Sequence, residues 1–193
     1  MAINRSLVGY VFLDRDGVVN RKQPEGAYVT DWRQFEWLPG AVEAIARLNR
    51  AGMTVIVVTN QRGIALGLYT HEQVELIHKN MRAHLALHGA RVDGIYYCPH
   101  DVGECRCRKP DVGLFEQACK DFPLASADNS VVIGDSLSDI QAGQRMDMKT
   151  IFIQGEADRQ KAGAEVAAES ADAVAGSLLE AVEDHLGLMT LSP

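Results

Sequence analysis

Two aspartates separated by one residue, Asp14 and Asp16, directly follow a short apolar run at residues 8–13. An apolar run of this length that ends in charge indicates a buried strand. Acidic groups at the carboxyl end of such a strand lie where open α/β sheets bind ligands. The two carboxylates can point the same way, and Gly17 would let the chain turn away. Their repulsion favours a hard cation such as Mg²⁺, although two surface aspartates in a turn are the simpler alternative.

Three further pairs of polar side chains come after later apolar runs that read as strands. Parallel strands bring their carboxyl ends to one edge of a sheet, so we expect all these groups at a common rim. Carboxylates, hydroxyl and amide donors, and cations together suit phosphoryl transfer, in which a carboxylate attacks phosphorus and the positive groups offset the repulsion. The three pairs are Thr59 with Asn60, Arg108 with Lys109, and Asp135 with Asp139.

A second cluster combines three cysteines with one histidine: Cys98, His100, Cys105 and Cys107. Four such ligands complete a closed tetrahedral Zn²⁺ site, which is structural because it leaves no open position. The alternative is a chance cluster of free thiols, and a disulfide between Cys105 and Cys107 is disfavoured in a reducing compartment. The remaining cysteine, Cys119, is expected to be a small apolar core residue.

The segments between these residues alternate between the patterns of strands and helices. This alternation predicts an α/β fold with a doubly wound, Rossmann-like, mostly parallel sheet. A capping box at Thr70 and Gln73 opens the longest predicted helix, which Gly89 ends. The other predicted helices begin at 41 and end before 52, and cover 112–122, 140–146 and 178–186; the other strands cover 54–58, 95–97, 131–133, 150–153 and 171–174. Residues 157–168 read as a helix or a loop.

Length and composition place limits on the function. A chain of 193 residues fits one domain over 1–193, with a frayed tail at 187–193. The net charge of −7 argues against a nucleic-acid or polybasic membrane partner, and no apolar run is long enough to span a bilayer. Because no cleavable signal sequence is apparent, we expect a cytoplasmic protein that is a monomer or a weak homo-oligomer and acts on a small phosphorylated molecule.

Four ordered stretches, FLDRDGVVN, VVTNQ, RKP and GDSLSD, resemble the motifs of the haloacid dehalogenase superfamily of phosphatases. The resemblance covers nearly the whole chain and implies a haloacid dehalogenase-like fold. Because no large insertion separates the motifs, it also implies a site without a large cap. The walls of the site would then be the segment 21–37 and a zinc-pinned loop, residues 98–109, which we call the zinc loop.

The resemblance also implies a role for each matching residue. Asp14 would be the nucleophile and a Mg²⁺ ligand, and Asp16 the general acid and base, with its backbone carbonyl on the metal. Asp135 would complete the protein ligands of Mg²⁺, and Asp139 would support the site from outside the ligand set. The remaining groups would bind the substrate: Thr59, Asn60 and Lys109 the transferring phosphate, and Arg108 a distal group such as a second phosphate.

The cysteine and histidine pairs just before RKP resemble a group that contains histidinol-phosphate and D,D-heptose 1,7-bisphosphate phosphatases. TNQRGIALG and DGIYYCPH are closer to the heptose branch, which implies removal of the 7-phosphate of a heptose bisphosphate. The short span between His100 and Cys105 departs from many members of that branch and is closer to the histidinol-phosphate type, so that activity is the alternative. A receiver-type phosphoacceptor domain is the non-enzyme alternative.

Overall fold

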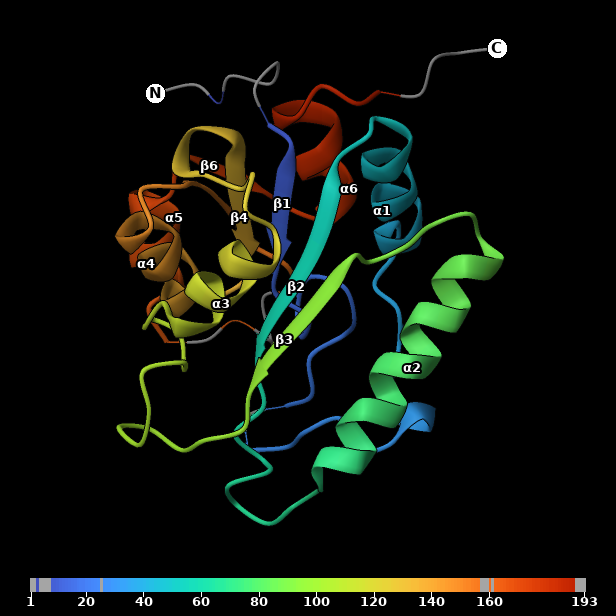
Figure 1. The fold of residues 1–193 in the computed structure, drawn as a ribbon, viewed down its shortest axis with the longest axis vertical. Coiled ribbons are helices and arrows are strands. Elements are labelled where there is room, and N and C mark those ends of the chain that lie inside the picture. The colour runs from blue at the N-terminus through green and yellow to red at the C-terminus, as the bar shows by residue number, and fades with distance from the viewer. Residues whose placement is uncertain (1–2, 4–7, 25, 157–159, 161, 190–193) are drawn as a thin grey trace.

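The computed structural model describes residues 3, 8–24, 26–156, 160 and 162–189. Its described strands form one parallel sheet in the order β3-β2-β1-β4-β5-β6 (Figure 1). The order runs one way from β1 to β3 and the other way from β4 to β6, so the switch point where such sheets bind ligands lies between β1 and β4. The strands are β1 (Tyr10–Leu13), β2 (Thr54–Asn60), β3 (Gly94–Cys98), β4 (Ser130–Gly134), β5 (Lys149–Ile153) and β6 (Ala173–Ala175).

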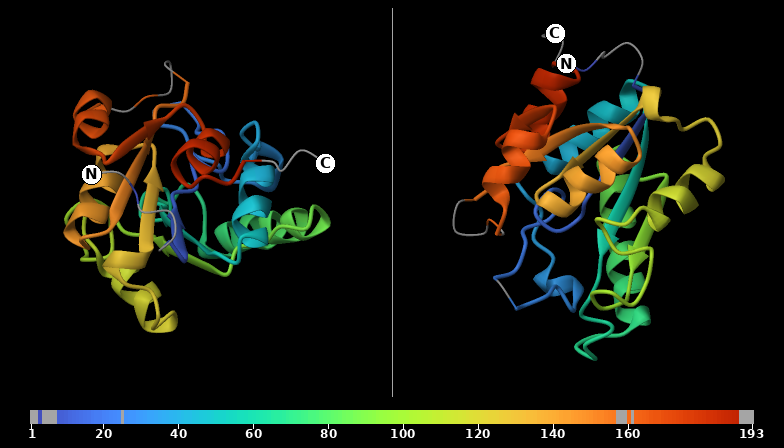
Figure 2. Two further views of the ribbon diagram at one scale, coloured as in Figure 1. Left: turned by 90° about the horizontal axis from the view of Figure 1, so that it is seen from above. Right: turned by 90° about the vertical axis from the view of Figure 1, so that its left-hand side faces the viewer.

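Helices cover both faces of the sheet (Figures 1 and 2). One face packs against α1 (Ala41–Arg50), α2 (His71–Leu87) and α6 (Leu178–Glu180), which continues as a π-helical turn over Ala181–His185. The other face packs against α3 (Gly113–Asp121), α4 (Leu137–Arg145) and α5 (Ala164–Ser170). Two short 3₁₀ helices complete the described secondary structure, at Trp32–Gln34 and Ala127–Asn129.

The central strand β1 shows why the sheet is covered on both sides. Val11 and Leu13 contribute to the core under α1 and α2, whereas Phe12 points to the opposite face. The Phe12 ring lies 5.4 Å from the Phe115 ring of α3, measured between centroids. Because alternate residues face opposite sides of a strand, an unbroken apolar run requires helices on both faces. The predicted doubly wound α/β fold is confirmed.

The ends of two helices show how capping residues set the boundaries. Helix α2 begins after Thr70, and the capping box with Gln73 is present as expected. Helix α4 begins at Leu137, three residues before the predicted start. The reason is a second capping box, in which the Asp139 carboxylate accepts the backbone N–H of Ser136 at 3.0 Å. Asp139 therefore has a structural contact in addition to any role in the site.

The C-terminal part agrees less closely with the sequence pattern. Within the predicted segment 157–168, residues 157–159 and 161 lie outside the described residues, and α5 covers Ala164–Ser170. The last predicted helix starts after its Ser177 cap but changes to π-helical geometry at Ala181. Of the tail 187–193, the last four residues lie outside the described part. Among the helices that the structure describes, none combines the length and apolar character of a membrane span.

Candidate active site

The carboxyl ends of β1 and β4 place Asp14 and Asp135 side by side. Leu13 pairs in register with Ile133, and the Asp14 backbone N–H donates to the Ile133 carbonyl at 2.9 Å. After Asp14 the chain turns at Gly17, whose φ is 103°. A Cβ there would lie only 2.2 Å from Oδ2 of Asp135, so a glycine is needed for this close approach. Both carboxylates are buried at the switch point of the sheet.

Lys109 supplies a buried positive charge next to the Asp14 carboxylate. Its Nζ lies 2.9 Å from Oδ1 of Asp14 and 2.5 Å from Oδ1 of Asp139, and it donates to the Val58 carbonyl at 2.6 Å. Burial lowers the pKa of Lys109, but the charges of Asp139 and Asp14 and their hydrogen bonds outweigh it and raise this pKa above its usual value. The lysine is therefore a permanent cation at this rim.

Arg108 and Lys109 reach the rim by a route that differs from the expectation. They do not stand directly at a strand end: β3 ends at Cys98, and the chain returns to the rim through the zinc loop. The Asn60 side chain at the end of β2 binds the backbone of Lys109, where the chain comes back to the rim. Its Nδ2 donates to the Lys109 carbonyl and its Oδ1 accepts the Lys109 N–H, each at 3.1 Å. Asn60 thereby fixes the backbone of the residue that carries the cation.

The Asp16 carboxylate is held by three side chains from two segments, the turn after β1 and the end of β2. Nη2 of Arg15 donates to Oδ1 at 2.9 Å and to Oδ2 at 2.8 Å. Asn20 donates to Oδ1 and Gln61 to Oδ2, both at 2.9 Å. Burial raises the pKa of Asp16, but the charge of Arg15 and the hydrogen bonds from Asn20, Arg15 and Gln61 outweigh it and lower this pKa. Asp16 is therefore a carboxylate in this conformation.

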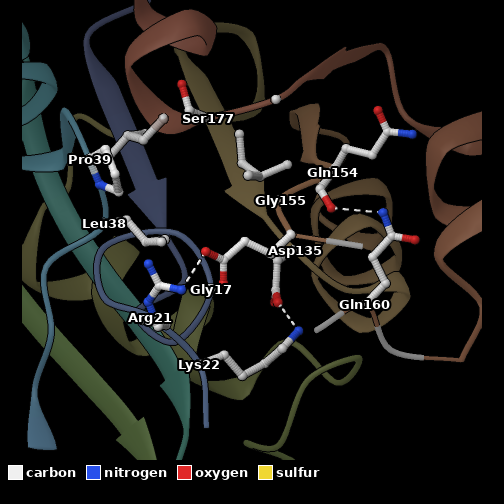
Figure 3. A pocket seen from close by; sticks show the side chains of 14 residues that line it. Gly17, Arg21, Lys22, Leu38, Pro39, Asp135, Gln154, Gly155, Gln160 and Ser177 are labelled. Carbon is white, nitrogen blue, oxygen red and sulfur yellow. Dashed lines mark hydrogen bonds and ion pairs between the residues drawn. The ribbon is translucent and has the colours of Figure 1, made fainter. Parts of the chain in front are cut away.

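Three buried carboxylates form a set of hard oxygen donors. One oxygen each from Asp14, Asp135 and Asp139 lies within 4.8 Å of the others. Oxygen-only donors of this kind fit Mg²⁺. Two lysines balance this negative charge: Lys109 from one side, and Lys22, whose Nζ pairs with Asp135 (Figure 3). The expected metal contact of the Asp16 backbone carbonyl stays a prediction.

A cavity of about 820 Å³ opens over the rim. The two segments expected to form its walls do line it, through residues 22–24 and 26–29 and through the zinc loop with its continuation to Asp111. Nη1 of Arg108 is buried there, without a hydrogen-bond partner among the described residues. A smaller cavity of about 260 Å³ lies beside Asp135 (Figure 3). The cations that line the larger cavity are Lys22, Arg62, Arg108 and Lys109.

The four expected zinc ligands converge at the end of β3. The Cys107 sulfur lies 3.2 Å from that of Cys98 and 3.1 Å from that of Cys105, and Nδ1 of His100 lies 3.3 Å from it. Tetrahedral Zn–S bonds near 2.3 Å place sulfurs about 3.8 Å apart, so the cluster needs only a small expansion to accept Zn²⁺. The backbone N–H of Gln61 donates to the Cys98 carbonyl at 2.8 Å, which joins the cluster to the end of β2.

The polar cluster at the end of β2 includes Gln61, as the sequence predicts, but sequence patterns did not identify Arg15 and His78 as parts of the surroundings of Asp16. Arg15 is fully buried, although it lies between two aspartates in the chain. His78 of α2 carries no sequence signal for this site, yet its Nε2 lies 3.2 Å from Nη1 of Arg15. Gln61 follows the expected pair at the end of β2 and contacts both Asp16 and Thr59. A charged residue inside a strand-end motif was the available signal for Arg15.

Comparisons with known proteins identify the family. Residues 106–181 match the HAD-hydrolase-like family model, where HAD denotes haloacid dehalogenase. A curated relative, the D-glycero-alpha-D-manno-heptose-1,7-bisphosphate 7-phosphatase of Mycobacterium bovis, is 46% identical over 68% of this chain and 69% of its own length. The chain belongs to the HAD family of phosphatases. A second HAD relative, the D-glycero-beta-D-manno-heptose-1,7-bisphosphate 7-phosphatase of Rhodopseudomonas palustris, is 37% identical over 75% of this chain and 83% of its own length.

Solved HAD structures agree with this assignment. The D,D-heptose 1,7-bisphosphate phosphatase of B. bronchiseptica, complexed with magnesium and phosphate, superposes with a TM-score of 0.81 and 31% identity, over 94% of this chain and all of the other. The enzyme of the same name from Burkholderia thailandensis gives a TM-score of 0.65 and 29% identity, over 92% of this chain and 97% of the other. The HAD-like fold and the phosphatase class predicted from the motifs are confirmed.

Proposed function

We propose that this HAD phosphatase removes the 7-phosphate of D-glycero-D-manno-heptose 1,7-bisphosphate through an aspartyl-phosphate on Asp14. The observation that carries the proposal is the pairing of Asp14 with the buried cation Lys109 beneath a large cavity lined by further cations. A bisphosphate needs positive charge at both of its ends. Lys109 is placed for the transferring phosphate, and Arg108, which lines the same cavity, for the distal one.

In the first chemical step, a carboxylate oxygen of Asp14 attacks phosphorus and the bond from phosphorus to the sugar oxygen breaks. Asp16 gives its proton to the departing alkoxide. The hydrogen bonds in this conformation favour the carboxylate form of Asp16, and the negative charge of a bound phosphate favours the protonated form that this step requires. Lys109 balances the charge of the transferring group, and the hydroxyl of Thr59, which accepts from Gln61 at 2.9 Å, retains its own proton for a phosphate oxygen. Mg²⁺ held by Asp14, Asp135 and the Asp16 carbonyl would add positive charge at the same phosphoryl group.

In the second step, water attacks the phosphorus of the aspartyl-phosphate. The Asp16 carboxylate takes the proton from this water, the bond between phosphorus and the Asp14 oxygen breaks, and inorganic phosphate leaves. The carboxylate form of Asp16 that its hydrogen bonds favour is the form that this step requires. Asp139 takes no part in bond making: it holds the Lys109 ammonium and the start of α4.

Phosphate release measured on several substrates tests the proposal. We expect the highest kcat/KM with heptose 1,7-bisphosphate, assayed as both anomers because relatives of both kinds are known, and little turnover of histidinol phosphate. Arg108→Met should lower kcat/KM for the bisphosphate by about 10-fold or more, because a charge-assisted contact to the distal phosphate is lost. The kcat/KM for heptose 7-phosphate, which has no distal phosphate, should change much less.

Arg50→Met is the matched control, since Arg50 is exposed on α1. A clear preference for histidinol phosphate would replace the proposed substrate. A stable phosphoprotein without turnover would instead support the receiver-type alternative.

We propose further that the cluster of Cys98, His100, Cys105 and Cys107 binds one structural Zn²⁺ ion. The donor set carries the proposal: three thiols and one imidazole converge in a segment that has few apolar residues of its own. The ion would fix the zinc loop, and through it the backbone that Asn60 holds at Lys109. Zinc would thus act on catalysis through position alone.

Cys107→Ser is expected to release zinc and to reduce kcat by about 10-fold or more, because small displacements of a phosphate-binding cation are costly. Metal analysis of the purified protein and thermal unfolding provide the measurements. Cys119→Ser on α3 is the control, because this thiol lies outside the cluster. Native protein that contains no zinc would contradict the structural-metal proposal.

The expected monomer or weak homo-oligomer and the cytoplasmic location stay predictions. The thiols of Cys98, Cys105, Cys107 and Cys119 are free of disulfides, which fits a reducing compartment.

A further inference from the structure

Arg15 is fully buried and its polar contacts converge on the candidate acid and base. Its Nη2 donates to both oxygens of the Asp16 carboxylate, at 2.9 and 2.8 Å. The Arg15 side chain lines neither of the two cavities described above, so it does not reach the substrate itself. Any effect of Arg15 on the reaction must therefore pass through a residue that does border the site, and Asp16 is such a residue.

Three other buried side chains fix the Arg15 guanidinium in place. Nη1 donates to Nε2 of His78 at 3.2 Å, and Nη2 also donates to Oε1 of Gln61 at 3.3 Å. The Tyr69 hydroxyl donates to the same Gln61 oxygen at 2.8 Å. Burial and the charge of Arg15 lower the pKa of His78 to about 3, so the ring is neutral and its Nε2 accepts. All four side chains are at most 4% exposed.

The contacts link Asp16 to elements that are distant in the chain. Gln61 follows β2 and also donates to Thr59, whereas His78 belongs to α2, whose apolar side packs into the core. A buried guanidinium is tolerated only where a negative partner and other acceptors satisfy it. Here the negative partner is Asp16 and the neutral acceptors are Gln61 and His78, so the orientation of the guanidinium is determined from several sides.

We propose that Arg15 is a positioning residue that holds the Asp16 carboxyl group in place for proton transfer, and that His78, Gln61 and Tyr69 hold Arg15. This inference rests on the proposed function, since it assumes that Asp16 moves the proton. It makes a selective prediction. Loss of Arg15 impairs the steps that need Asp16, while attack by Asp14 continues, because Lys109 and the buried carboxylates that would hold Mg²⁺ are unchanged.

Two substrates separate these steps. The heptose bisphosphate releases the alkoxide of heptose 1-phosphate, which needs the proton of Asp16, whereas 4-nitrophenyl phosphate releases the stabilised 4-nitrophenolate anion, which does not. With Arg15→Met, we expect the first-turnover rate on the heptose bisphosphate to fall by about 10²-fold, at the low end of the range for a general acid. The first-turnover release of 4-nitrophenolate should stay within about 3-fold, followed by slower steady-state turnover because the second step needs the base. Asp16→Ala serves as the reference, because it removes the proposed acid and base completely.

Substitutions at His78 provide an independent test should Arg15→Met not fold. His78→Phe keeps an aromatic ring but removes the acceptor, and we expect the same selective loss, of about 10-fold. His78→Gln restores an acceptor and should recover most of the rate. His88→Phe, at the exposed end of α2, is the matched control.

Equal losses on both substrates, or no loss on either, would overturn the positioning role. Wild-type protein that fails to hydrolyse the heptose bisphosphate would instead refute the proposed function. The nitrophenyl phosphate comparison between wild type and variants would still report on Arg15 in that case.

Discussion

Replacing Asp14 by asparagine is expected to abolish phosphate release and leave the fold intact. The substitution keeps the shape of the side chain and an oxygen that can accept from Lys109, but it removes the nucleophilic carboxylate. Loss of a covalent nucleophile lowers kcat by at least about 10⁴-fold in well-studied enzymes. Single-turnover assays on the heptose bisphosphate measure the loss, and thermal unfolding reports on the fold.

The covalent intermediate itself can also be sought. Wild-type protein quenched in acid during turnover should carry a phosphoryl group on the peptide that contains Asp14, and Asp14→Asn should carry none. Asp128→Asn is the control, because Asp128 is an exposed carboxylate outside the site. Retained turnover by Asp14→Asn, or a phosphoryl group on another peptide, would remove Asp14 from the role of nucleophile.

Lys109→Met is expected to damage both catalysis and stability. The ammonium lies between Asp14 and Asp139, so its removal leaves two buried carboxylates without this cation and the Val58 carbonyl without this donor. Breaking a buried ion pair from one side costs about 3–5 kcal/mol of unfolding free energy. The loss of the charge that balances the transferring phosphate should lower kcat by about 10²–10³-fold as well.

Urea unfolding and phosphate release measure the two effects of this change. Lys120→Met on α3 is the matched control, since Lys120 is exposed and should change neither quantity by much. Unfolding free energy close to that of the wild type would show that the buried pairs contribute little to stability. Near-normal turnover would exclude Lys109 from phosphate neutralisation.

Much of the fold was predictable because local patterns and global packing agree. The runs that form β1 and β4 are apolar on both faces, which only a doubly covered sheet satisfies. Parallel pairing of these strands then brings Asp14 and Asp135 together without further information. The convergence of Cys98, His100, Cys105 and Cys107 was predictable for a different reason: four donors at short spacing are what a tetrahedral metal site requires, whatever the surrounding fold.

The parts of the site that could not be predicted depend on contacts between residues that are distant in the chain. Nothing local indicates that His78, on a helix 63 residues after Arg15, turns a buried face toward it. The reciprocal hydrogen bonds between Asn60 and Lys109 likewise join a strand end to a loop that no periodicity describes. The sequence places Arg108 and Lys109 at the end of the zinc loop, but their grouping with the strand ends did not show that this loop carries the chain from β3 back to the rim.

The central position of β1 has a consequence for the durability of the site. This strand pairs on both sides, with β2 and with β4, and Val11, Phe12 and Leu13 are fully buried. Amide hydrogens in such a segment exchange with solvent only when the whole domain opens. The residue that follows β1 is therefore anchored to the slowest-exchanging part of the molecule, whereas the walls of the large cavity are loops. Sequence changes in those loops can reshape the walls of the cavity, and with them the choice of substrate, while the Asp14 carboxylate keeps its place.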